Sequence, residues 1–217
     1  MAEEEVELQM LISSSDPIMP RVITFLSSLL QRVAESNDTD RSEPQRVSVF
    51  DGLTRPAISV QSYLERIFRY ANCSPSCYVV AYIYLDRFAR RHPSLPINSY
   101  NVHRLLITSV LVAAKFMDDV CYNNAYYAKV GGISTAEMNF LEVDFLFGLS
   151  FQLNMTPDTF NSYFTFLQRE MLCIDKPPNL TTKTQYCLLL LEDDYESNNN
   201  NNINDNHLHQ NQTQLAV

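Results

Sequence analysis

The chain has 217 residues, enough for one domain of ordinary size with extensions at its ends. Apolar residues make up 46% of it, and only 4 glycines are present, which argues against a Gly-rich phosphate loop and against a β fold with many tight turns. The formal net charge is −9, yet residues 17–176 hold 15 basic and 15 acidic side chains, so the acidity lies in the two ends. A neutral central region is poorly suited to nucleic acid, and we expect no nucleic-acid partner.

The cysteines are five in number, and no secretory signal is recognisable, which predicts reduced thiols in an intracellular protein. Cys73 and Cys77 could begin a metal site, but a second Cys or His pair at suitable spacing is missing. We therefore predict no metal and no other cofactor. The apolar runs are far shorter than the ~20 residues of a membrane span, so no membrane partner is expected.

The first part of the chain is predicted to be a flexible acidic N-terminus over residues 1–16. From Pro17 to Val33, apolar residues recur at spacings of three and four, which predicts an amphipathic helix. Residues 35–57 form a polar connector, in which Phe50 could anchor the chain to the domain.

Two further helices are predicted before the centre of the chain. Ser59, or Ser62 in competition with it, can cap a helix that reaches Ala71. Ser74-Pro75 is a favourable start for the next helix, which runs through Phe88.

The segment from about Asn98 to Met117 is apolar on most of its circumference, as expected for a helix at the centre of a domain. A short helix is predicted around Tyr126–Val130. Ser134, with Glu137 three residues later, has the spacing of a capping box and predicts the start of another helix.

That helix is predicted to end with Gly148 as its C-terminal cap, and Thr156-Pro157 opens a last helix. The pattern predicts an all-α protein, a single helical bundle around a central buried helix with an extra N-terminal helix. We expect the domain to span residues 17–172. Residues 173–217, rich in Asn and Gln, are expected to form a mostly disordered tail.

No set of residues with the pattern of a catalytic site was found. His92 and His103 lie apart from any obvious nucleophile or metal ligand, and a structural role is expected for both. Asp118-Asp119 resembles part of the Asp-rich motif of all-α terpenoid synthases, but the third carboxylate is missing. We predict that the chain is not an enzyme.

Two charged residues occupy unusual positions on predicted apolar helices. Lys115 lies near the end of the central helix, and one interpretation pairs it with Asp118 or Asp119 at the surface. Glu142 shares a helical face with apolar residues, where a carboxylate is costly without a partner. Glu142 is therefore either an ordinary boundary charge or part of a protein-binding surface.

Three stretches of this chain resemble the cyclin box in their order and spacing. The chain is most similar to the plant P-type, or U-type, cyclins, which are small single-box cyclins related to fungal phosphate-response cyclins. The stretches are Tyr82-Ile83-Tyr84-Leu85-Asp86-Arg87-Phe88, Ala113-Ala114-Lys115-Phe116 with Asp118-Asp119, and Met138-Asn139-Phe140-Leu141-Glu142.

The resemblance implies a regulatory subunit that binds and activates a cyclin-dependent serine/threonine kinase, such as an A-type plant kinase, in the nucleus or the cytoplasm. The pathway would be cell division or phosphate and other nutrient signalling. In cyclins, the Lys and Glu at the positions of Lys115 and Glu142 contact the kinase near its regulatory C-helix. Phe116, Phe145 and Leu149 are candidates for the accompanying apolar contacts.

The resemblance is incomplete at the first helix of the box. Mitotic-type cyclins carry a Met-Arg-Ala-Ile-Leu motif there, whereas this chain reads Ile58-Ser59-Val60-Gln61-Ser62, so substrate docking of the mitotic kind is not expected. The adjacent Asp86 and Arg87 are interpreted as a structural polar pair that ties helices together. A cyclin-fold adaptor with a non-kinase partner is the alternative function.

Overall fold

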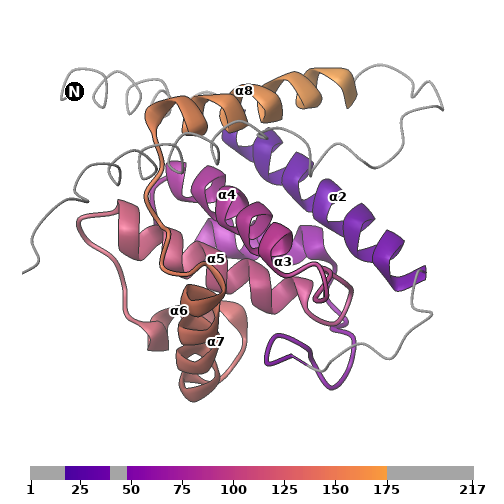
Figure 1. Ribbon diagram of the computed structural model, residues 1–217, viewed down its shortest axis with the longest axis vertical. Helices are drawn as coiled ribbons and strands as arrows, with labels where there is room; N and C mark the ends of the chain where they lie inside the picture. The colour runs from indigo at the N-terminus through magenta and orange to yellow at the C-terminus, as the bar shows by residue number, and fades with distance from the viewer. Residues whose placement is uncertain (1–17, 40–47, 175–217) are drawn as a thin grey trace, which may run out of the picture. The chain divides into compact units, whose positions relative to one another are not determined.

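The computed structural model describes residues 18–39 and 48–174, and these residues form helices and no strands (Figure 1). The predicted all-α class is confirmed. The predicted N-terminal segment and nearly all of the predicted tail lie outside the described residues. The helices are α2 (Ile18–Thr39), α3 (Val60–Tyr70), α4 (Ser76–Arg91), α5 (Val102–Met117), α6 (Asn124–Gly131), α7 (Thr135–Gly148) and α8 (Pro157–Ile174).

The central helix of the bundle is α5, as its composition predicts. Every residue from Val102 to Ala114 is buried except Arg104. The helix packs against α3, α4, α6 and α7, so it is enclosed on several sides at once. It surfaces at its C-terminal end, where Lys115 and the two residues after it are exposed.

The starts of the helices follow their capping residues. The hydroxyl of Ser59 accepts a hydrogen bond from the N–H of Ser62 at 3.1 Å, so Ser59 is the cap of α3. In the same way, Ser134 accepts a bond from the N–H of Glu137 at 3.1 Å and fixes the start of α7. The boundary predicted near Asn98 for the central helix was too early, because residues 98–101 form a turn before α5.

The first described helix, α2, packs against α3 and α8. It extends beyond the predicted end near Val33, although its last residues are polar. The side chain of Asn37 donates to the carbonyl of Ile97 at 2.8 Å, and Asp38 accepts from the N–H of Ser99 at 3.1 Å. These bonds to the turn before α5 hold the polar end of α2 in helical form.

Gly148 is the last residue of α7 and does not have the left-handed conformation of a glycine cap, so the prediction for its role was wrong. Leu149 is the cap, and the chain adopts positive φ angles at Ser150 (51°) and Phe151 (57°) instead. A Cβ at Gly148 would collide with the ring of Phe88, which is buried beneath it. Glycine is therefore needed for space between α4 and α7.

Asp86 and Arg87 of α4 make contacts with the C-terminal part of the domain. Asp86 accepts a bond from the hydroxyl of Tyr163 in α8 at 2.5 Å. Arg87 donates to the backbone carbonyls of Gln152 (3.1 Å) and Asn154 (3.0 Å) in the segment before α8. The two side chains therefore tie α4 to different parts of the chain rather than to each other.

Candidate functional site

The two charges that stand out in the sequence form an ion pair between helices. Nζ of Lys115, at the end of α5, lies 2.6 Å from Oε1 of Glu142 in the middle of α7. The interpretation that paired Lys115 with Asp118 or Asp119 was wrong. Asp118 instead accepts a bond from the backbone N–H of Ser74 at 2.9 Å, at the start of α4.

A second ion pair joins the same two helices nearer the start of α5. Arg104, three turns before Lys115, pairs with Glu137 in the first turn of α7. Between them Thr108 is buried, and its hydroxyl donates to the carbonyl of Arg104 at 2.7 Å. Two ion pairs, at Arg104 and at Lys115, therefore connect α5 to α7.

The sequence of α7 places Glu142 at the boundary between core and solvent. Met138, Leu141 and Phe145 are the buried residues of this helix, and Glu142 follows directly after one of them. Its side chain is 15% exposed, against 35% for Lys115. A carboxylate this far from water needs partners, and the structure supplies two of them.

The second partner of Glu142 is Asn124, the first residue of α6. Its Nδ2 lies 2.7 Å from Oε2 of Glu142 and 2.8 Å from Oδ1 of Asn139. Nothing in the sequence pattern indicates this contact, because it depends on how α6 is oriented against α7. The group thus joins Lys115 of α5 and Asn124 of α6 with Asn139 and Glu142 of α7.

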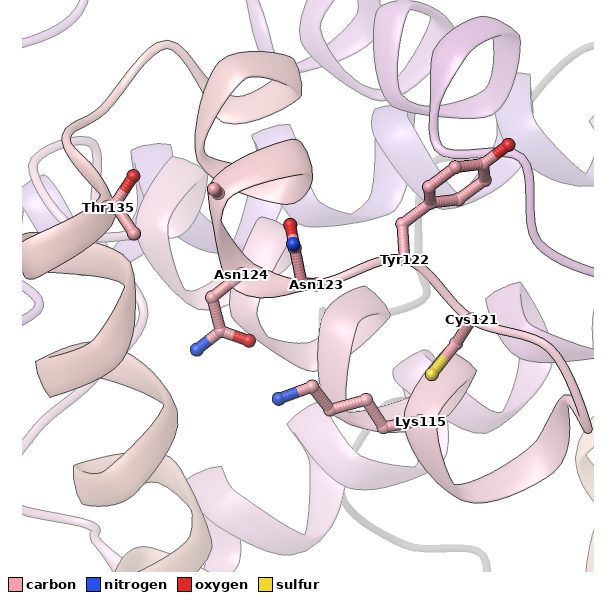
Figure 2. A pocket seen from close by; sticks show the side chains of 7 residues that line it. Lys115, Cys121, Tyr122, Asn123, Asn124 and Thr135 are labelled. Atoms are coloured by element: carbon pink, nitrogen blue, oxygen red, sulfur yellow. The ribbon is translucent and has the colours of Figure 1, made fainter.

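An open recess lies beside this group, as Figure 2 shows. It has a volume of about 500 Å³ and is lined by Lys115, Thr135 and residues 121–125. The side chains of Lys115 and Asn124 both reach into it (Figure 2). Lys115 and Asn124, the two partners of Glu142, are therefore accessible from the side of the loop between α5 and α6.

The predicted apolar contacts divide into exposed and buried residues. Phe116 is 42% exposed, next to Lys115, whereas Phe145 and Leu149 are completely buried. The assignment of Phe145 and Leu149 to a binding surface needs correction, because their side chains fill the core beneath α7. Phe147 and Phe151 are exposed, and their rings meet edge to face with centroids 5.2 Å apart.

His92 and His103, and the pair Cys73 and Cys77, make structural contacts in the described part of the chain. Nε2 of His92 donates to the carbonyl of Gly148 at 3.0 Å, and Nε2 of His103 donates to that of Ile58 at 2.9 Å. A hydrogen bond from Cys77 lowers the pKa of the Cys73 thiol. Across residues 18–39 and 48–174, no group of three or more His, Cys, Asp or Glu side chains is arranged to hold a metal ion.

Among the helices that the structure describes, none is long and apolar enough to cross a membrane.

The region that matches known proteins contains the helices from α2 to α7. The cyclin family model matches residues 13–153. Cyclin-U4-1 of Arabidopsis thaliana is 63% identical over 203 residues, which cover 92% of this chain and 96% of that protein. Cyclin-P4-1 of Oryza sativa subsp. japonica is 62% identical over 182 residues, covering 81% of this chain and 86% of the relative. Cyclin-U1-1 of Arabidopsis thaliana is more distant, at 41% identity over 172 residues, which are 77% of this chain and 82% of that protein.

Proposed function

The chain belongs to the cyclin family, whose role is regulatory, and from this premise we propose that it binds and activates a cyclin-dependent serine/threonine kinase. The observation that carries the proposal is the ion pair of Lys115 and Glu142. It stands at the one end of the central helix that reaches the surface.

Lys115 and Glu142 can each still form hydrogen bonds with a partner protein after they have bonded to each other. An ammonium group has more N–H donors than one bond uses, and a carboxylate has more lone pairs than two bonds use. Lys115 can therefore donate to a partner carbonyl while Glu142 accepts from a partner N–H. The backbone of a loop that leads into a helix offers both free carbonyl and free N–H groups, which fits the segment at the C-helix of a kinase.

Activation in this proposal is a shift between conformations of the kinase. Contacts at Lys115 and Glu142 favour the inward position of the C-helix, which aligns the kinase's own Lys–Glu pair and its metal-binding Asp. The chain contributes no catalytic group. It stabilises the active conformation by binding that conformation more tightly than the inactive one.

In this proposal, the apolar part of the interface comes from exposed aromatic side chains on α5, on α7 and just beyond α7. Phe116 follows Lys115 directly, and Phe147 and Phe151 lie at and just beyond the end of the helix that carries Glu142. Large exposed aromatic residues are typical of protein-binding surfaces, where they supply most of the free energy of association. Phe116 stays in the proposed contact surface, and Phe147 and Phe151 replace the buried Phe145 and Leu149.

The kinase in this proposal is of the plant A-type, and it acts in cell division or in phosphate and other nutrient signalling. The nucleus or the cytoplasm is the proposed place of action, because protein kinases of this class phosphorylate their substrates there.

The test exchanges the two charges of the ion pair. Lys115→Glu combined with Glu142→Lys keeps an ion pair between α5 and α7, so the free energy of unfolding should change by less than about 1 kcal/mol. The charges presented to the kinase are reversed, and the affinity should fall by about a hundredfold or more. Titration calorimetry with a recombinant plant A-type cyclin-dependent kinase measures the affinity. Phosphorylation of a peptide substrate reports activation.

The matched control exchanges the other ion pair, with Arg104→Glu and Glu137→Arg. It reverses charges between the same two helices, but away from the end of α5, and should leave kinase affinity within about twofold. Unchanged affinity of the Lys115/Glu142 variant would remove this site from the proposal. A wild-type chain that binds no such kinase would favour the adaptor function.

A further inference from the structure

The amide of Asn124 holds one oxygen of the Glu142 carboxylate, while Lys115 holds the other. The Lys115 ammonium lies 2.6 Å from Oε1, and Nδ2 of Asn124 lies 2.7 Å from Oε2. The two donors come from α5 and α6, and the acceptor is on α7. Fixed at both oxygens, the carboxylate cannot turn about its last side-chain bond without breaking a hydrogen bond.

The orientation of the Asn124 amide is itself determined by its surroundings. Its two N–H groups face two acceptors, Oε2 of Glu142 and Oδ1 of Asn139 at 2.8 Å. Turning the amide over would point its oxygen at the carboxylate and lose both bonds. The Asn124 oxygen is buried and has no hydrogen-bond partner among the described residues, so the two donated bonds outweigh that cost.

The backbone that carries Asn124 is fixed independently of the carboxylate. Asn123 caps α6 by accepting a bond from the N–H of Tyr126 at 3.1 Å, so the helix begins at Asn124. The hydroxyl of Tyr126 donates to the carbonyl of Tyr70 at 2.6 Å and ties α6 to the end of α3. Hydrogen bonds at the start of α6, and between α6 and α3, therefore hold the backbone of Asn124 in place.

We propose that Asn124 is a positioning residue of the partner-binding site, which holds the Glu142 carboxylate so that its remaining lone pairs face an incoming N–H donor. This inference rests on the proposed function, because it specifies how the same site is prepared for the kinase. Without Asn124, the carboxylate can rotate about its terminal bond and follow Lys115, and the kinase must then order it on binding.

The first experiment compares Asn124 with a helix-capping residue outside the site. Calorimetry with the plant A-type cyclin-dependent kinase should find Asn124→Ala about tenfold weaker than the wild type, which is the effect of one hydrogen bond to a charged group. Ser59→Ala removes the cap of α3, away from the recess, so it should lower the melting temperature but leave the affinity within about twofold. Equal losses of affinity in both variants would show that only the stability of the domain matters, and would overturn the positioning role.

The second experiment asks whether Asn124 acts through Glu142. In a chain that already carries Glu142→Gln, the further change Asn124→Ala should weaken kinase binding by less than about twofold. Additive losses would overturn the inference, because they would mean that Asn124 acts on the kinase by another route.

The third experiment gives a readout that loss of packing does not produce. Asn124→Asp places a second carboxylate against Glu142, and the two share the single ammonium of Lys115. Like charges this close favour protonation of one of them, so the variant should bind the kinase severalfold more tightly at pH 6 than at pH 8 relative to wild type. The same ratio at both pH values would count against the contact.

Failure of this inference can be told apart from failure of the proposed function. If the wild type binds the kinase and Asn124→Ala binds it equally well, the function stands and the positioning role is wrong. If the wild type does not bind the kinase, both fail as statements about the kinase. The melting temperatures of the four chains in the Asn124/Glu142 cycle then still decide whether Asn124 holds the carboxylate, with additivity as the negative result.

Discussion

His103 is a titratable residue inside the most buried helix of the domain. Its ring meets that of Tyr63 edge to face, with centroids 4.9 Å apart, and its Nε2 donates to the carbonyl of Ile58. Burial lowers the pKa of His103 below its usual range, because the charged ring would lose water without gaining an anionic partner. The folded domain thus holds this ring in its neutral form.

This state of His103 predicts a loss of stability in mild acid. Below about pH 6.5 the unfolded chain takes up a proton at His103 that the folded chain resists, so the free energy of unfolding falls as the pH drops. His103→Gln keeps a donor for Ile58 and removes the titration. Urea unfolding between pH 7.5 and 5.5 should therefore show about 1 kcal/mol less pH-dependent loss in the variant than in the wild type. Parallel curves for the two chains would contradict the prediction.

At the scale of elements, one buried carboxylate contributes to the contact between α4 and α8. Asp86 of α4 accepts from the hydroxyl of Tyr163 and lies 2.9 Å from Nε of Arg90. Burial raises the pKa of Asp86 in spite of these partners, so the carboxylate is desolvated as well as bonded. A buried group with several partners is costly to remove, because its partners stay behind unsatisfied.

Two substitutions should separate the contribution of the Asp86 carboxylate to stability from that of its hydrogen bond with Tyr163. Asp86→Ala leaves the half-buried Arg90 and the Tyr163 hydroxyl without their acceptor, and we expect a loss of about 3 kcal/mol in the free energy of unfolding. Tyr163→Phe removes a single hydrogen bond and should cost about 1 kcal/mol. Urea denaturation followed by circular dichroism measures both. Equal losses would mean that Asp86 contributes only its bond to Tyr163.

The elements themselves could be predicted because their signals are local. Ser59 and Ser134 fix helix starts through bonds that reach only three residues along the chain. The C-terminal ends of the helices are harder to predict, because tertiary contacts determine them. The last turn of α2 is held by bonds to the turn before α5, and Gly148 is set by the nearby Phe88.

At the scale of the whole molecule, the candidate site joins three consecutive helices at one point. The sequence indicates Lys115 and Glu142 separately, as charges on apolar helices, since burial cost depends on local pattern. It does not indicate that they pair with each other, or that Asn124 joins them, because those contacts depend on the angles between α5, α6 and α7. Phe145 is apolar and close to Glu142 in sequence, so the sequence predicts it as a contact residue. Its burial beneath α7 also depends on how the helices pack, which the sequence pattern does not indicate.

The enclosure of α5 has a consequence for the kinetics and thermodynamics of association. A helix surrounded by α3, α4, α6 and α7 opens only when the domain unfolds, so its amide hydrogens should be among the slowest to exchange with deuterium. Lys115 lies near the C-terminal end of this helix. The helical hydrogen bonds continue past it, because the N–H of Asp118 donates to the carbonyl of Ala114 at 3.0 Å. The backbone beneath the site is thus already ordered before a partner arrives.

Association at this surface should then resemble the docking of two rigid bodies. Hydrogen-exchange mass spectrometry should find peptides spanning residues 102–114 equally protected in the free chain and in the complex, with new protection confined to surface segments. The heat-capacity change of binding should match the apolar area of the interface alone, without the excess that accompanies folding on contact. A large gain in protection within α5 would show instead that the partner completes the fold of its own binding site.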